Sequence, residues 1–144
     1  MNNELMPITV EAKVLAPVAK VWKCWVTPED IMQWNAASDD WHTPSASVDL
    51  RVGGTFVSRM EARDGSMGFD FGGTYTEVET HALIVFQFGE GANLRQVRIE
   101  FVPHGDATVV RETFTPETTH PVEAQRSGWQ SILNRFKSHV ETQP

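Results

Sequence analysis

The chain has 144 residues, of which 40% are hydrophobic, and this is enough for one domain with a packed core. Its formal charge of −7 disfavours nucleic acids and anionic membranes as partners, and its single cysteine excludes an internal disulfide and a thiolate metal cage. No apolar run approaches the length of a membrane span, and the first residues, MNNELMP, lack the features of a signal peptide. We therefore expect one cytoplasmic domain over residues 1–144.

The first part of the chain predicts a strand followed by two short helices. Hydrophobic and polar residues alternate strictly over residues 8–15, which is typical of a half-buried strand. Pro17 suits the first turn of a helix, and apolar residues follow it at helical spacing. Thr27 and the proline after it begin a second short helix, with Trp34 on its buried side.

The segment WNAASDDWHTP, residues 34–44, contains side chains that bind metals or move protons. These are Asp39, Asp40 and His42, but no second histidine stands at metal-ligand spacing, and paired aspartates in a loop are usually solvated turn formers. We therefore expect a mobile rim without a metal, in which both carboxylates lie in water. Trp41 is too apolar for such a loop, and we expect it to turn toward the mouth of an internal cavity.

The middle of the chain predicts six antiparallel strands separated by glycine-containing turns. A double glycine at residues 72–73 suggests a bulge or a sharp bend. The regular hairpin spacing indicates a curved antiparallel sheet. The predicted strands cover residues 47–52, 55–62, 69–79, 82–88, 94–102 and 107–114.

The last part of the chain predicts a long amphipathic helix over residues 121–141. Its apolar stripe contains Trp129, Ile132, Leu133 and Phe136, and it is long enough to lie across a sheet. Gly128 costs about 1 kcal/mol relative to alanine inside a helix. We expect this cost to be offset by a close approach of the helix to the sheet or by room for a ligand.

Short motifs accompany this order of elements. They are Ala16-Pro17, Val21-Trp22, Thr27-Pro28-Glu29, Trp34, Arg51-Val52-Gly53-Gly54-Thr55-Phe56, Asp64-Gly65, Gly73-Thr74-Tyr75-Thr76-Glu77-Val78 and Gly128-Trp129. Together they resemble the family named for homology to the activator of heat-shock protein 90 ATPase, which is part of the START-like (SRPBCC) superfamily.

The resemblance implies the fold and suggests a range of functions. It implies one α+β START-like domain of the helix-grip type, a curved antiparallel sheet wrapped around a long C-terminal helix, with two short helices after the first strand. In that superfamily a cavity between helix and sheet binds apolar molecules, and a few members catalyse cyclisation or hydration there. The family name itself comes from a co-chaperone.

Glu112 is the candidate for chemistry within such a cavity. Strict alternation on the last strand places it among inward-facing residues, where a carboxylate is costly unless it is paired. One interpretation is a bulge, or a position near an open end that water reaches. The other is a polar anchor for a ligand or a general acid/base. We favour the first interpretation.

We expect a non-enzymatic protein that binds a small apolar, aromatic or lipid-like molecule, without a cofactor or metal, as a monomer or homodimer. One alternative is a cyclase- or hydrolase-like enzyme that uses Glu112 as acid/base in the same cavity. The other is a chaperone-associated domain that binds a protein partner. The residues expected to contact a ligand are Trp25, Trp34, Trp41, Phe56, Met60, Phe71, Tyr75, Phe86, Glu112, Gln125, Trp129 and Leu133.

Overall fold

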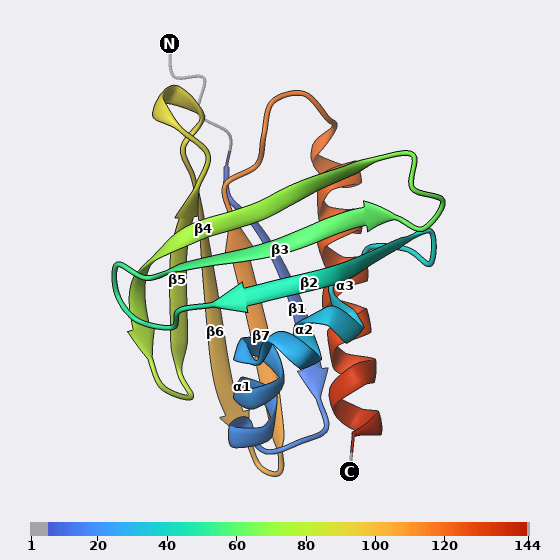
Figure 1. The fold of residues 1–144 in the computed structure, drawn as a ribbon. Helices are drawn as coiled ribbons and strands as arrows, with labels where there is room; N and C mark the ends of the chain where they lie inside the picture. Colours follow the sequence, from blue (N-terminus) through green and yellow to red (C-terminus); the bar gives the residue numbers. More distant parts are fainter. Residues whose placement is uncertain (1–5, 144) are drawn as a thin grey trace.

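Strand β1 (Ile8–Val14) opens the part of the chain that the computed structural model describes, residues 6–143 (Figure 1). Two short helices follow, α1 (Val18–Val26) and α2 (Pro28–Trp34). The other elements are β2 (Trp41–Val48), β3 (Thr55–Ala62), β4 (Gly68–Glu79), β5 (Leu83–Phe88), a 3-10 turn (Gly91–Asn93), β6 (Arg95–His104), β7 (Ala107–Phe114) and α3 (Val122–Thr142). This order confirms the α+β helix-grip fold.

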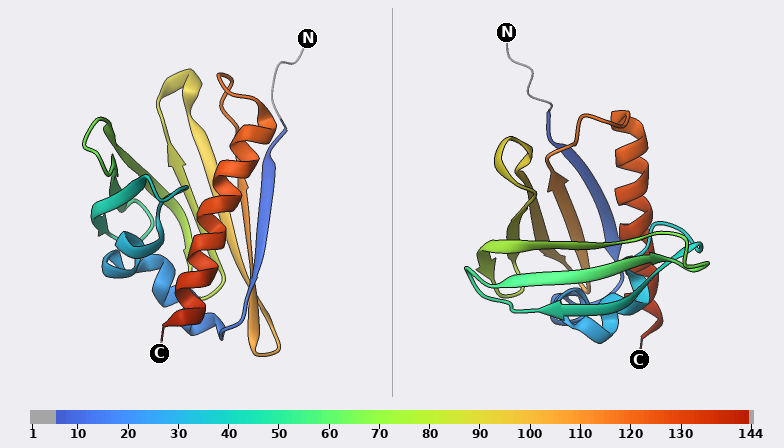
Figure 2. Two further views of the ribbon diagram at one scale, coloured as in Figure 1. Left: turned by 90° about the vertical axis from the view of Figure 1, so that its right-hand side faces the viewer. Right: turned by 45° about the horizontal axis from the view of Figure 1, so that its top comes forward.

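The seven strands form one antiparallel sheet in the order β1-β7-β6-β5-β4-β3-β2. Strands β2 to β7 are consecutive neighbours and form a meander, while β1 pairs with the last strand, β7. The sheet curls strongly, so that β2, β3 and β4 cross over the space in front of the other strands (Figures 1 and 2). Helix α3 and the two short helices lie along the open side of this curve.

Helix α3 is fixed by an apolar side and by polar contacts with an edge strand. Leu133, Phe136 and Val140 are fully buried, whereas Trp129 and Ile132 are half-buried. Three other side chains of α3 donate hydrogen bonds of 2.8–3.2 Å to backbone carbonyl oxygens of β1. They cover a sheet edge that would otherwise offer unpaired carbonyl groups to another chain. These donors are Arg126, Gln130 and Lys137.

Gly128 does not bring α3 close to the sheet. A Cβ atom added at this position would have no heavy atom within 4 Å apart from its immediate neighbours in the helix. The expected close approach is therefore wrong. None of the helices in residues 6–143 is both long enough and apolar enough to cross a membrane.

The second strand lies earlier in the sequence than predicted. It begins at Trp41 rather than Ser47, so the last part of the predicted loop, through Pro44, belongs to β2. Proline is tolerated because β2 is an edge strand and its register shifts between His42 and Ser45, which places Pro44 in an irregular step. The alternation pattern did not predict the first part of this strand because it contains several polar residues and a proline.

The double glycine of β4 serves close packing of backbones rather than a bulge. The β3–β4 register is continuous at Gly72 and Gly73, and the irregularity lies farther on, between Tyr75 and Glu77. A Cβ atom on either glycine would come within 2.5 Å of a carbonyl oxygen on a neighbouring strand. The predicted bulge is therefore wrong in position, and the glycines are required because no side chain fits there.

Candidate functional site

A cavity of about 270 Å³ lies between the sheet and the three helices. Residues of β2, β3, β4, β5 and β7 form its sheet side, and residues of α1, α2 and α3 form its helical side. The lining residues are Trp25, Ile31, Trp34, Asn35, Val48, Phe56, Ser58, Met60, Phe69, Phe71, Tyr75, Ile84, Phe86, Glu112, Trp129 and Ile132.

Two groups of aromatic side chains build the cavity walls. On the helical side Trp25, Trp34 and Phe136 contact one another, with ring centroids 4.8–5.0 Å apart. The indole Nε1–H of Trp34 donates to the carbonyl oxygen of Cys24 at 3.0 Å, so its polar atom is satisfied away from the cavity. On the sheet side Phe56 is the centre of the second group. Its centroid lies 4.7–5.9 Å from those of Phe71, Tyr75 and Phe86.

Trp129 connects α3 to the sheet at the cavity. Its ring stacks on that of Phe114 of β7, with the centroids 4.0 Å apart and the planes inclined by 10°. Trp129 and Ile132, which is three residues farther along α3, both line the cavity. A fluorescent side chain therefore forms part of the cavity wall.

Three polar side chains face this apolar space without a protein partner. Glu112, Ser58 and Tyr75 are only 7%, 4% and 6% exposed, and none forms a side-chain hydrogen bond with another described residue. Burial raises the pKa of Glu112 to about 8, and burial together with the Asp49 carboxylate raises the pKa of Tyr75 above its ordinary value. Near neutral pH the carboxyl group of Glu112 is thus mainly protonated and can donate a hydrogen bond.

The structure excludes one part of the interpretation that we favoured for Glu112, the bulge. The register of β7 is continuous there, with Val10 of β1 opposite on one side and Ile99 of β6 on the other. Glu112 is therefore not in a bulge, and its side chain, 7% exposed, lines the cavity. Its inward orientation follows from the strict alternation of β7, in which Thr108, Val110 and Phe114 are also buried.

Nine of the twelve residues expected to contact a ligand line the cavity, and three do not. Trp41 does not itself line the cavity, but its ring packs against that of the lining residue Phe69, at a centroid distance of 5.9 Å. Gln125 forms hydrogen bonds with the backbone of Glu117 and His120, which hold the segment before α3. Leu133 is fully buried in the hydrophobic core.

Seven lining residues were not among those expected to contact a ligand. Ser58 lies between Phe56 and Met60 on the same face of β3, so the alternation of inward and outward residues along this strand could have identified it. Asn35 follows α2 and offers no such signal. The others are Ile31, Val48, Phe69, Ile84 and Ile132.

The candidate metal-binding residues of the first loop do not form a metal cluster within the described part of the chain. Asp39 and Asp40 are exposed, as expected. Asp39 forms an ion pair with Arg135 of α3, and this guanidinium lowers the pKa of its carboxyl group. Arg63 donates to the backbone carbonyl oxygen of Asp39 at 2.9 Å. This loop is thus tied to α3 and to the end of β3.

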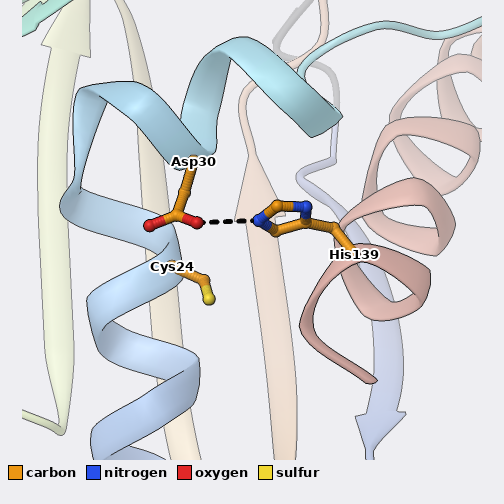
Figure 3. Close-up of side chains that lie close together, drawn as sticks. All are labelled: Cys24, Asp30 and His139. Atoms are coloured by element: carbon orange, nitrogen blue, oxygen red, sulfur yellow. Dashed lines mark hydrogen bonds and ion pairs between the residues drawn. The ribbon is translucent and has the colours of Figure 1, made fainter. Parts of the chain in front are cut away.

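A different group of metal-type side chains meets where the three helices join (Figure 3). One donor atom each from Cys24, Asp30 and His139 lies within 4.8 Å of the other two. The Oδ1 atom of Asp30 lies 2.9 Å from Nε2 of His139. Its Oδ2 atom has no partner in hydrogen-bonding geometry among residues 6–143, although the ammonium of Lys23 lies 3.0 Å away.

This cluster is better suited to holding the helices together than to binding a metal. Thiol, carboxylate and imidazole form a donor set that zinc accepts, but zinc needs the thiolate. Burial raises the pKa of the Cys24 thiol, and both oxygens of Asp30 already face a partner. We therefore interpret Asp30 as a structural link between α2, α1 and the end of α3.

Comparisons with known structures identify close structural relatives. The chain is similar to the solution structure of an AHSA1-like protein from Aeromonas hydrophila, with 46% identity, a TM-score of 0.87, and coverage of 94% of this chain and 92% of that one. It is also similar to a protein from Cytophaga hutchinsonii, with 52% identity, a TM-score of 0.80, and coverage of 97% and 93%. A protein from Chromobacterium violaceum shares the fold at 20% identity, with a TM-score of 0.84 over 96% of this chain and 100% of that one.

No curated protein sequence matches the chain. The family described as "Activator of Hsp90 ATPase homolog 1-like protein" matches residues 15–141, which include all elements from α1 to β7 and nearly all of α3. With the helix-grip fold, the two relatives above and the motifs in their expected order, this match shows that the chain belongs to the family of Activator of Hsp90 ATPase homolog 1-like proteins.

Proposed function

We propose that the protein binds a small, mainly apolar molecule in the cavity between α3 and the sheet, without converting it. The observation that carries this proposal is the cavity of about 270 Å³, whose walls are mostly aromatic and aliphatic and which holds a few unpartnered polar groups. Apolar walls with a small number of placed polar groups are typical of ligand sites.

The expected affinity follows from the apolar surface that a ligand would remove from water. At about 25 cal/mol per Å², burial of a few hundred square ångströms contributes several kcal/mol. The entropy lost on association reduces this contribution, so we expect dissociation constants in the micromolar range.

The set of lining residues favours binding over catalysis. Among the described residues that line the cavity, the ionisable ones are Glu112 and Tyr75, and burial raises the pKa of both. General acid/base catalysis works best with a group whose pKa lies near the working pH. Of these two residues, Glu112 meets this condition and Tyr75 does not, so the cavity lining offers one such group and no second one to act with it. No activated nucleophile lies beside it in the cavity lining.

A thermal-shift screen of aromatic and lipid-like compounds tests the proposal. A ligand at 100 times its dissociation constant should add about 2.7 kcal/mol to the free energy of unfolding. Binding should also change the emission of Trp129, because its ring lines the cavity. Incubation followed by chromatography should return the compound unchanged, whereas conversion that is lost in Glu112→Gln would favour the enzyme alternative.

A pair of variants on α3 provides the control. Ile132→Trp replaces an aliphatic side chain at the cavity wall with a bulky indole ring and should abolish the ligand-induced thermal shift. Val122→Trp adds the same ring at an exposed position of the same helix and should leave the shift unchanged. The proposal fails if no compound stabilises the protein, or if the ligand stabilises both variants equally.

A further inference from the structure

We propose that the ligand is an uncharged aromatic molecule with a hydrogen-bond-accepting oxygen, such as a ketone or ester carbonyl, that receives a hydrogen bond from the carboxyl group of Glu112. This inference rests on the proposed binding function and adds to it the chemical class of the ligand.

The charges around the cavity disfavour an anionic ligand. Among the described lining residues there is no lysine, arginine or histidine, and Glu112 is the one carboxylic acid. A carboxylate or phosphate inside the cavity would lose its hydration without gaining a cationic partner. A fatty acid or a phospholipid head group therefore does not fit this interior.

A cationic ligand is also disfavoured. To pair with an amine, Glu112 would have to ionise between Val10 and Ile99, which are 3% and 0% exposed. Removing two charges from water is offset only when further hydrogen bonds satisfy both ions. The other polar groups at the cavity, such as the hydroxyls of Ser58 and Tyr75, carry no charge that could assist.

The protonated carboxyl group of Glu112 has a donor that no described residue accepts. Buried polar groups in proteins are nearly always hydrogen-bonded, and an unpaired one is costly. A carbonyl oxygen on the ligand would accept this hydrogen bond without adding charge. A plain hydrocarbon would instead leave the donor buried and unsatisfied.

The volume sets the size of the aromatic part. An apolar cavity of about 150 Å³ is enough for benzene. The cavity here is about 270 Å³, so it has room for a molecule of roughly two fused rings with a small substituent. The aromatic side chains on both walls suit such a ring system through edge-to-face and offset contacts.

Three naphthalenes substituted at the same ring position separate the ligand classes. Acetylnaphthalene carries a neutral carbonyl group, isopropylnaphthalene has nearly the same shape without oxygen, and naphthoate is an anion. Calorimetric titration of the whole protein near pH 7 should show acetylnaphthalene binding about tenfold more tightly than isopropylnaphthalene, and naphthoate binding most weakly.

Two variants assign the preference to Glu112. Glu112→Leu should remove the roughly tenfold difference between acetylnaphthalene and isopropylnaphthalene, because the donor is gone. Glu112→Gln keeps a neutral donor, and it should retain most of the preference. In the wild type the affinity for acetylnaphthalene should fall as the pH rises above about 8, where Glu112 ionises, whereas Glu112→Gln should show no such fall.

The outcomes distinguish this inference from the proposed function. Equal affinity for acetylnaphthalene and isopropylnaphthalene, or tightest binding of naphthoate, would overturn the ligand class and leave the binding function intact. A preference that persists in Glu112→Leu would overturn the role of Glu112. If no naphthalene binds and the wider screen also finds no stabiliser, the inference fails together with the proposed function.

Discussion

Glu112 makes the stability of the protein depend on pH in the direction opposite to most carboxyl groups. Its pKa is about 8 in the folded protein and near the ordinary 4.5 in an unfolded chain, because burial penalises the charged form. Between these two values the unfolded chain releases a proton that the folded protein keeps. Glu112 therefore contributes no penalty below about pH 4.5, and its penalty grows until about pH 8.

Glu112→Gln should remove this penalty. We expect the variant to gain stability relative to the wild type as the pH rises from about 5 to 9, by up to a few kcal/mol at about 1.4 kcal/mol per pKa unit. Urea unfolding of both proteins across this range measures the difference, in which the titration of all other groups cancels. A difference that does not change with pH would show that Glu112 is ionised in the folded protein.

Asp30 illustrates a residue whose role only the structure reveals. Burial alone would raise the pKa of its carboxyl group, but the hydrogen bond with His139 and the contact with Lys23 outweigh burial and hold the pKa below its ordinary value of 3.8. The stabilisation is therefore present above about pH 4 and is lost as the pH falls through the folded-state pKa.

Asp30→Asn should lower the free energy of unfolding by about 1–3 kcal/mol near pH 7. The difference from the wild type should shrink as the pH falls below the ordinary carboxyl value of 3.8 and through the lowered folded-state pKa of Asp30. Chemical unfolding at several pH values provides the measurement. Asp39→Asn is the matched control, since Asp39 also pairs with a cation but its side chain is 95% exposed, and this replacement should have a far smaller effect. Equal effects of the two variants would contradict the structural role of Asp30.

At the scale of elements, the sequence predicts those whose burial pattern is regular. Strand β1 alternates buried and exposed residues at every position, and α3 repeats its apolar residues at helical spacing, so both lie close to their predicted bounds. Strand β2 was not predicted with its true start because Thr43 is its one buried position and Pro44 stands at its irregular step. Pairing with β3 determines β2, and that pairing is a tertiary contact.

Two glycines inside regular elements, Gly128 in α3 and Gly73 in β4, should respond differently to alanine. Gly128→Ala should stabilise the protein by about 1 kcal/mol, because the added methyl group meets no atom within 4 Å and alanine is the better helix former. Gly73→Ala should be strongly destabilising, because its Cβ would lie 2.5 Å from the carbonyl oxygen of Gln87. Thermal unfolding of the two variants tests both signs. A destabilised Gly128→Ala would show that α3 needs a glycine for a reason other than space.

At the scale of the whole molecule, the sequence predicts the components of the cavity better than their assembly. Phe56, Met60, Phe71 and Tyr75 were expected to contact a ligand, and all four line the cavity. The contact between Asp30 and His139 joins residues 109 positions apart and depends on how the helices meet. No local pattern encodes such a meeting, so the sequence could not reveal it.

The cavity is also a volume that the protein leaves without side-chain packing, although filling it would stabilise the fold. Ser58 is 4% exposed, lines the cavity and has no side-chain hydrogen bond with a described residue. Ser58→Leu should fill part of the space with apolar atoms and raise the free energy of unfolding of the ligand-free protein by about 0.5–2 kcal/mol. The same side chain should occupy the volume of the ligand and weaken its binding.

Paired measurements of unfolding and of ligand affinity test this trade-off, with Ser47→Leu as a matched substitution at an exposed position of β2. We expect Ser47→Leu to change neither quantity appreciably, since its leucine points away from the interior. If Ser58→Leu stabilises the protein and the ligand still binds with wild-type affinity, the ligand occupies another site. If Ser58→Leu destabilises the protein, the space beside Ser58 is too small for a leucine, and the room that remains for a ligand lies nearer Glu112. A stabilised variant that no longer binds would show that the protein keeps this volume open at the expense of its own stability, which is the behaviour expected of a binding site.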